Sequence, residues 1–363
     1  MDGDDEEDEM WIIQAVGKLI KALRSDCREA GSESVEQRLL RSGEDTIRTF
    51  EDLYNSANSF LFRDHFRMKA DDFDALYELC KPLIPTKIEH PREVIAVTLD
   101  WLGRGASCRD QELKFSLAYS TIHRYRRVGL YAVVTALHYM VKMPSAVPDD
   151  FVSRFPYFEQ AIAAIDGVHI PVVVTRSDAE RFRNRKGWTS TNVLIASDWS
   201  MNVAFLYVGA EGAAHDSMVL SHGEFLLSVP DCHYVIADAG YALQPQVLTP
   251  YRGVRYHRKE FAEGTGRPAN KKELFNLRHA KARNIVERLI GCLKRRFKIL
   301  RVPIECEFAV AKAAIFACAC LHNFIRQRNG ADLAEDMCGN VSDDAEDDNE
   351  EDARAPLPFD FSE

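Results

Sequence analysis

The chain has 363 residues, of which 46% are hydrophobic and 28% are charged, as is typical of a globular protein with one large or two medium cores. It contains no run of 18 apolar residues, so we expect no transmembrane helix and no membrane partner, and its acidic first residues do not resemble a secretory signal. Nine scattered cysteines without a CxxC pair predict reduced thiols rather than a disulfide framework.

The formal net charge of −10 is unevenly distributed along the chain. Residues 1–10 hold seven acids and no base, and residues 331–363 hold thirteen acids and one base. We expect both segments to be acidic disordered tails, because they contain too few apolar residues to form a core. Residues 11–330 carry 45 Lys and Arg against 36 Asp and Glu, a net charge of +9. A basic core of this kind predicts a polyanionic partner.

The N-terminal region, residues 11–150, is predicted to be helical. Apolar residues recur every three or four positions in residues 11–24, which favours an amphipathic helix. A second helix is expected to start at Ala70 and to end near Pro82, because acidic residues follow Ala70 and proline cannot continue a helix.

A helix-turn-helix-like segment is predicted at about residues 92–140. A helix is followed by a turn that contains Gly103 and Gly105, by a short helix, and by a longer helix that opens near Ser120. This is the order of elements in a DNA-binding helix-turn-helix. Three-helix packings without a DNA partner have the same order, so both interpretations remain open.

Residues 151–330 are predicted to form a mixed α/β domain, because strands come first and then alternate with helices. The apolar, β-branched run at 163–174 predicts a central strand, and the next two strands are expected to form a hairpin with a turn at Trp199. Further along, the sequence predicts a helix at 216–228, a buried strand at 233–238 and a long helix at 277–301, with an insertion or loop over the sheet at about 243–276.

Asp166 needs an explanation because it lies within an otherwise apolar strand. A lone buried carboxylate is strongly destabilising unless it is paired, protonated or bound to a cation. By strand alternation, Asp166 shares a face with Val168 and Ile170, whereas His169 points to the other side. The alternative to a functional role is an ordinary buried aspartate paired with an arginine.

Two further carboxylates occupy suggestive positions. Asp238 ends a predicted strand, where α/β sheets build their sites, although aspartate also commonly starts turns there. Glu287 lies on the long helix among cations, with Gly291 one turn further on. The alternative for Glu287 is an i,i+4 ion pair with Arg283. Taken together, two strand carboxylates and one helix carboxylate could converge on a pair of divalent cations that promote phosphoryl displacement.

At these residues the chain resembles a known family, the PIF/Harbinger transposases and the nuclease derived from them in animals, within the DDE superfamily of endonucleases. The resemblance covers roughly residues 65–325. The matching segments include AAIDGVHIPV, RNRKGWTSTNVLIASD, GAAHDSMVL, YVIADAGYALQPQVLTPY, RNIVERLIGCLKRRFKIL and LHNF. It implies an α/β fold class, in which an RNase H-like mixed-sheet catalytic domain follows the helical, helix-turn-helix-like N-terminal domain.

The resemblance also implies roles for individual residues. Asp166, Asp238 and Glu287 match the acidic triad that coordinates two Mg²⁺ or Mn²⁺ ions in the family. Asp216 matches a recurrent auxiliary acid, although we favour an N-cap role for it at the helix from Ser217. The family commonly works with a Myb-like DNA-binding protein. Cleavage at two transposon ends predicts a homo-oligomer, and a DNA substrate predicts the nucleus, with the cytoplasm as the alternative.

The long helix carries the best candidates for DNA contacts. Between Lys271 and Arg301 there are eleven Lys and Arg residues against only two acids. Such cations neutralise phosphate charge, although some would simply be solvated or pair with the acidic tails. The predicted DNA-binding residues are Arg283, Arg288, Lys294, Arg295, Arg296 and Lys298. In contrast, we interpret Cys318, Cys320 and His322 as buried core residues rather than as a zinc site.

Three functions remain open on this basis. The leading hypothesis is a metal-dependent DNA endonuclease or transposase that cleaves phosphodiester bonds at transposon ends by a two-metal mechanism. The second is a domesticated transposase that acts as a DNA-binding or chromatin-associated regulator without transposition. The third is an RNase H-like enzyme that acts on RNA or a hybrid duplex, since the same chemistry serves both backbones.

Overall fold

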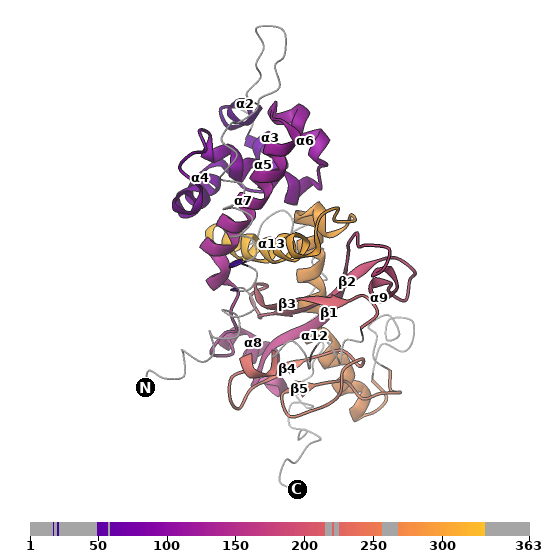
Figure 1. Ribbon diagram of the computed structural model, residues 1–363. Helices are drawn as coiled ribbons and strands as arrows, with labels where there is room; N and C mark the ends of the chain where they lie inside the picture. Colours follow the sequence, from indigo (N-terminus) through magenta and orange to yellow (C-terminus); the bar gives the residue numbers. More distant parts are fainter. Residues whose placement is uncertain are drawn as a thin grey trace.

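Helices and a mixed sheet form two stacked parts of the computed structural model (Figure 1). The structure describes residues 49–56, 59–214, 220, 225–255 and 268–330, together with residues 17, 20 and 21. Helices α2 to α7 lie at one end, the sheet lies at the other, and α13 crosses between them (Figure 1). The two predicted tails, most of the helix predicted at 11–24 and Asp216 lie outside the described residues.

The first helices confirm the helical pattern of the N-terminal region. Helix α4 starts at Ala70, as predicted, and ends at Cys80, where Pro82 allows only a short 3-10 turn. The other elements before residue 160 are α2 (Thr49–Tyr54), α3 (Ser59–Phe66), α5 (Pro91–Arg104), α6 (Cys108–Phe115), α7 (Tyr119–Leu137), η2 (His138–Met140), α8 (Asp149–Arg154) and η3 (Pro156–Phe158).

Helices α5, α6 and α7 follow one another in the predicted order. Gly105 ends α5 with φ +60°, a left-handed conformation that glycine adopts readily, and Ser107 opens α6 with a capping box. Arg126 of α7 is buried against this turn: its guanidinium stacks on Trp101 at 4.8 Å and donates to the carbonyl of Ala106. This arginine therefore fixes the three helices to one another.

The sheet has five strands in the order β3-β2-β1-β4-β5. Its strands are β1 (Ala161–Pro171), β2 (Ser190–Ser197), β3 (Val203–Glu211), β4 (Tyr234–Ile236) and β5 (Val247–Leu248). Strands β1, β2 and β3 pair antiparallel, which confirms the predicted hairpin, whereas β4 and β5 run parallel to β1. The short helix α9 (Ala179–Phe182) lies between β1 and β2, and η4 (Phe225–Ser228) precedes β4.

The predicted insertion at about 243–276 is partly wrong. Val247 and Leu248 form the edge strand β5, and the first turns of the long helix begin at Lys271, within the same stretch. The two apolar residues pair with β4, so they belong to the sheet and not to a loop over it. The long helix starts earlier than predicted because the Asn270 side chain caps it by accepting from the backbone N–H of Glu273.

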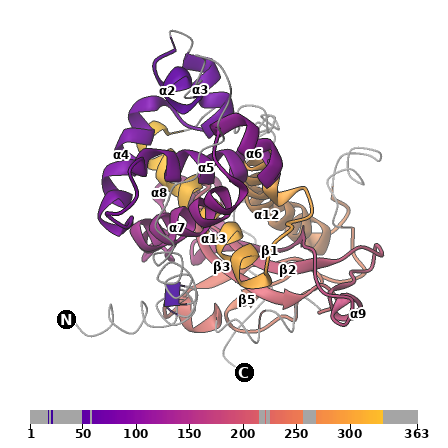
Figure 2. The same cartoon turned by 45° about the horizontal axis from the view of Figure 1, so that its top comes forward.

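Two long helices cover one face of the sheet. Helix α12 (Lys271–Arg296) contacts β1, and α13 (Phe308–Asn329) contacts β3 and the N-terminal helix α7 (Figure 2). The 3-10 turn η5 (Lys298–Leu300) joins α12 to the segment before α13. One continuous hydrophobic core includes residues of α5, α7, the sheet, α12 and α13, and a second core lies on the other face of the sheet.

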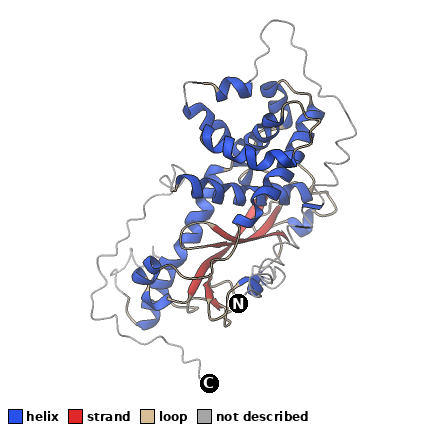
Figure 3. Cartoon of the chain, turned by 90° about the vertical axis from the view of Figure 1, so that its left-hand side faces the viewer, coloured by secondary structure: helices blue, strands red, loops and turns tan. Residues whose placement is uncertain are grey.

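Helix α13 is long and apolar enough to cross a membrane by length and composition, although it contains no uninterrupted run of 18 apolar residues. However, 83% of its most apolar 18-residue stretch is buried inside the fold, so its composition is that of a central core helix. Figure 3 shows this helical layer above the strands. Cys318 and Cys320 are completely buried on α13, as predicted, and burial raises the pKa of both thiols.

The LHNF segment at the end of α13 ties the helices to the sheet. The Asn323 side chain accepts from the backbone N–H of Val203 at 2.8 Å and donates to the carbonyls of Val203 and Met140. The imidazole of His322 is buried beside it, with Nε2 donating to the carbonyl of Met201 at 2.9 Å. These bonds satisfy backbone groups at the start of β3, so this motif is structural.

Replacing Asn323 with alanine should destabilise the protein by about 2–4 kcal/mol, because buried backbone groups of Val203 and Met140 would lose their partners. The free energy of unfolding measured in urea tests this expectation. Gln327→Ala, at an exposed position one turn further along α13, is the control and should change stability by less than about 0.5 kcal/mol. Equal effects of the two substitutions would contradict the structural role of Asn323.

Candidate active site

Asp166 lies in the middle of β1, on the face of the sheet that packs against α12. Val168 and Ile170, which share that face by strand alternation, pack in the core beneath the helices. His169 faces the other way, as predicted: its ring contacts a hydroxyl on β2. The backbone N–H of Gly167 donates to Asp166 Oδ1 at 2.9 Å and fixes the orientation of the carboxylate.

Asp238 lies beside Asp166 because of the register between two parallel strands. Ala164 of β1 is paired with Ile236 of β4. Asp166 lies two residues after Ala164, and Asp238 lies two residues after Ile236. Neighbouring strands are about 4.8 Å apart, so the two carboxylates emerge next to each other. The backbone N–H of Ala239 donates to Asp238 Oδ1 at 2.7 Å, which orients this second carboxylate.

Arg283 of α12 links two of the three predicted carboxylates. Its Nη1 lies 3.4 Å from Asp166 Oδ2, and its Nη2 donates to Glu287 Oε1 one turn along the helix. The Arg283 side chain is 10% exposed, whereas that of Glu287 is 49% exposed. The two structural alternatives, an Asp–Arg pair at Asp166 and an i,i+4 pair at Glu287, are therefore both present and share one arginine.

The three acids act on one another electrostatically. The pKa of Asp166 is raised to about 6, chiefly by burial, and the nearby charges of Asp238 and Glu287 contribute in the same direction. Arg283 and the backbone N–H of Gly167 work in the opposite direction. Two strands and a helix thus bring three carboxylates into one electrostatic neighbourhood, where negative charge exceeds the positive charge of a single arginine.

The donor chemistry of this neighbourhood fits a hard divalent cation, which prefers carboxylate oxygens. Among the described residues, no group of three Asp, Glu, His or Cys side chains is close enough to hold an ion as the side chains stand. Arg283 accounts for this arrangement, because its guanidinium lies between Asp166 and Glu287 and supplies the positive charge there. The carboxylates fit a metal in charge and ligand type, and Arg283 would have to turn away from them.

The sequence reasoning missed two buried polar residues of α12. The side chain of Asn276 accepts from the backbone N–H of Tyr251 and donates to the carbonyl of the same residue, which fixes the loop after β5. His279 Nε2 donates to the carbonyl of Leu248 at 3.1 Å, and burial lowers the pKa of this imidazole to about 4, so it is neutral at pH 7. The available signal was polar residues at helical spacing along one face of the helix, of which Asn276, His279 and Arg283 are buried.

The structure separates the six predicted phosphate contacts into two groups. We correct the prediction for Arg283 and Arg296, because both residues are buried, with 8% and 3% of the whole residue exposed. Arg283 contacts the carboxylates, and Nη1 of Arg296 lies 2.5 Å from His322 Nδ1 in the core. The remaining four lie nearer the surface: Lys298 is exposed, and Arg288, Lys294 and Arg295 are half-buried. Their contact with DNA stays a prediction.

Comparison with known proteins shows what the segment that contains this site is similar to. Residues 165–323 match the family model of the DDE superfamily endonucleases, a segment that begins just before Asp166, contains Asp238 and Glu287, and ends at Asn323. This match confirms the resemblance to the DDE superfamily that the motifs indicated. It covers the sheet together with α12 and most of α13.

Two curated relatives agree with this class. The chain is 24% identical over 179 residues to the Rattus norvegicus protein named "Putative nuclease HARBI1", an alignment that covers 47% of each chain. It is 24% identical over 255 residues to "Protein ALP1-like" of Arabidopsis thaliana, covering 64% of this chain and 59% of that relative. The chain thus spans about half to three fifths of these relatives. No solved structure matches significantly.

The raised pKa of Asp166 predicts a measurable effect on stability in metal-free buffer. The pKa in the folded state, about 6, exceeds the ordinary value of 3.8, so the folded protein holds this proton more tightly than the unfolded chain. The resulting stabilisation is complete below about pH 4 and is lost as the pH rises through about 6. The variant Asp166→Asn has no carboxyl group to titrate, so it does not lose this stabilisation. Between pH 4 and pH 7.5, the free energy of unfolding of the variant should therefore increase by about 2–3 kcal/mol relative to that of wild type.

Urea unfolding at the two pH values measures this difference. Asp72→Asn is the control, because Asp72 is a buried aspartate whose carboxylate instead contacts Arg328 Nε at 2.7 Å. This control should lose stability relative to wild type at pH 7.5, since it leaves Arg328 without its charged partner. A stability difference between Asp166→Asn and wild type that stays constant with pH would refute the raised pKa.

Proposed function

We propose that the protein is a divalent-metal-dependent DNA endonuclease of the DDE type, with Asp166, Asp238 and Glu287 as its acidic triad. The observation that carries this proposal is the register of β1 and β4, which places Asp166 beside Asp238, opposite a helix that presents Glu287 within the segment matching DDE endonucleases. The strand order and directions are compatible with an RNase H-like domain.

The three carboxylates would hold two Mg²⁺ or Mn²⁺ ions. When bound, these ions would activate the attacking water or 3′-hydroxyl and stabilise the departing 3′-oxygen. The residues of the chain position this chemistry: the backbone N–H groups of Gly167 and Ala239 orient the two aspartates, and the buried face of α12 holds Glu287 over the sheet. Arg283 holds Asp166 and Glu287 together, and bound cations would take over its positive charge there.

The basic surface beside the triad supports a nucleic-acid substrate. Arg288, Lys294, Arg295 and Lys298 follow Glu287 along α12 and its end, and none of the four is fully buried. Contacts of this kind with phosphates position a nucleic acid without reading its sequence. We also propose a Myb-like partner for site recognition, a homo-oligomer for action at two DNA ends and a nuclear location, all of which follow from the resemblance to the transposase family.

Cleavage of a duplex that carries the terminal repeats tests the proposed activity. Wild-type protein should cut DNA in Mg²⁺ or Mn²⁺, and Asp166→Ala and Glu287→Gln should reduce the rate at least about 1000-fold, because each removes a metal ligand. DNA affinity should stay within about threefold of wild type. The control is Glu307→Gln, the same chemical change at an exposed glutamate away from the triad, which should cut normally.

The outcome for wild type also separates the alternative functions. Preferential cutting of RNA or a hybrid duplex would assign the same chemistry to another backbone. Specific binding of the terminal-repeat DNA without cutting in either metal, with and without the Myb-like partner, would reject the endonuclease proposal and support a DNA-binding regulator.

A further inference from the structure

A cavity of about 670 Å³ lies between the N-terminal helices and the end of α12. It is lined by residues of α3, α5 and α6, by the turn between α5 and α6, and by η5. Its charged lining is mainly cationic: Arg67, Arg104, Lys114 and Lys298 stand against Asp100 and Asp110. We call this cavity the junction cleft. It is separate from the acidic site and is not explained by it.

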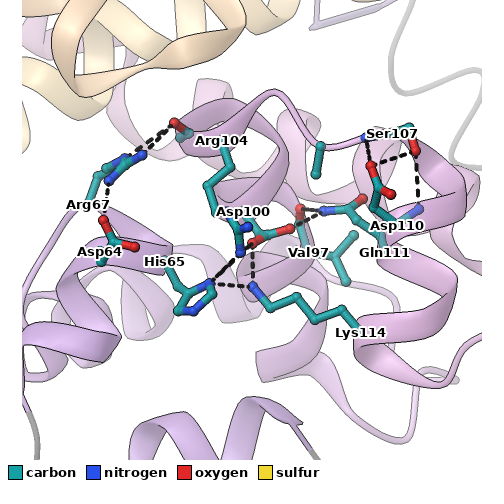
Figure 4. A network of polar contacts seen from close by, with 12 residues as sticks. Asp64, His65, Arg67, Val97, Asp100, Arg104, Ser107, Asp110, Gln111 and Lys114 are labelled. Carbon is teal, nitrogen blue, oxygen red and sulfur yellow. Dashed lines mark hydrogen bonds and ion pairs between the residues drawn. The ribbon is translucent and has the colours of Figure 1, made fainter.

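Asp100 is the buried centre of the cluster in the junction cleft. Its side chain is 1% exposed, accepts from Lys114 Nζ and from Gln111 Nε2, and lies 3.7 Å from Arg104 Nη1. Although burial opposes it, contacts with His65 and Lys114 keep the pKa of Asp100 below its ordinary value. Figure 4 shows His65, Arg104 and Lys114 gathered around this carboxylate.

The carboxylate of Asp100 cannot neutralise all of the positive charge around it. Arg104 Nη1 and Lys114 Nζ both contact Asp100, and they lie 2.7 and 2.8 Å from His65 Nδ1. One acid therefore balances two permanent cations here. The other lining acid, Asp110, accepts from the backbone N–H and hydroxyl of Ser107 as part of the capping box of α6. The cleft retains a net positive charge, and such clefts attract anions.

Lys298 connects the junction cleft with the acidic site. It is exposed, lines the cleft and follows the last turn of α12. Gly105 packs against the segment that follows α12: a side-chain carbon at that position would lie 3.0 Å from Val302 and 3.7 Å from Lys298. Lys298 lies eleven positions after Glu287, and the first nine of these positions belong to α12; a helical rise over eleven residues is about 16 Å, which equals the length of about five base pairs.

We propose that the junction cleft binds the sugar–phosphate backbone of the DNA that flanks the cleavage site, through Arg104, Lys114 and Lys298. Asp100 and His65 hold the first two of these side chains in place, so the contacts are built before the DNA arrives. This proposal rests on the DNA substrate proposed above. It assigns to the N-terminal helices a contact with phosphate that requires no reading of bases.

The test compares two double variants of the full chain that remove the same charge. Arg104→Gln/Lys298→Gln alters the cleft, whereas Lys81→Gln/Lys87→Gln removes two exposed lysines of the same helical region that do not line it. Fluorescence anisotropy with a labelled duplex over a salt series, in Ca²⁺, gives the affinities. The cleft variant should bind about tenfold more weakly at about 100 mM salt, and its salt slope should fall by about 2. The control should stay within about twofold of wild type.

A shorter duplex gives a second readout that separates loss of the cleft contact from misfolding, because a misfolded variant would also bind short DNA more weakly. DNA that extends less than about five base pairs beyond the cleavage site should bind wild type and the cleft variant equally, because it cannot reach Lys298. The single substitution Lys298→Gln, at an exposed position, should lower the salt slope by about 1. Thermal stability of each variant confirms that it is folded.

The possible results distinguish this proposal from the proposed function. If wild type binds and cuts DNA but the cleft variant behaves like the control, the junction cleft proposal fails and the endonuclease stands. If pyrophosphate raises the melting temperature of wild type but not of the cleft variant, while their DNA affinities are equal, the cleft binds free anions and not DNA. If wild type binds no DNA at all, both proposals fail.

Discussion

The contact of Arg283 with Asp166 and Glu287 is the interaction on which the candidate site depends. It joins the central strand of the sheet to α12, and it is the positive charge that allows acids from both elements to lie close together. Without a compensating cation, three carboxylates in a largely buried region would repel one another and favour protonation. The same arginine therefore stabilises the fold and occupies space that a divalent cation would need at the proposed site.

Much of this arrangement could be predicted from the sequence, because local signals agreed with the final structure. The apolar run around Asp166 specified a central strand, the short turn at Trp199 specified a hairpin, and alternation placed Asp166 on the correct face. The helical order before residue 140 was also correct. In each case, periodicity or turn chemistry within a few residues carries the information. The complete series of motifs, taken in chain order, indicated the family, which no single motif would have done.

The errors have a common physical cause, which is that burial depends on distant partners. Arg283 and Arg296 lie in the same basic run as the exposed Lys298, and only packing against β1 and α13 shows that they are internal. The edge strand β5 consists of two residues and is defined by pairing with β4, so its own sequence reads as part of a loop. His322, predicted to be a core residue, is not among these errors: its bond and those of Asn323 to the start of β3 are structural.

Helix α12 explains why catalysis and binding of the flanking DNA would be coupled. Glu287 and Arg283 face the sheet from its middle, and Lys298 follows its end at the junction cleft. Val286, Leu289 and Leu293 bury the side of the helix between these points in the core that continues to α5 and α7. Close packing transmits displacement instead of absorbing it. A shift of α12 that moves Arg283 off the carboxylates would therefore also move Lys298, so DNA held at the proposed cleft site would act on the same helix that carries Glu287 of the proposed metal site.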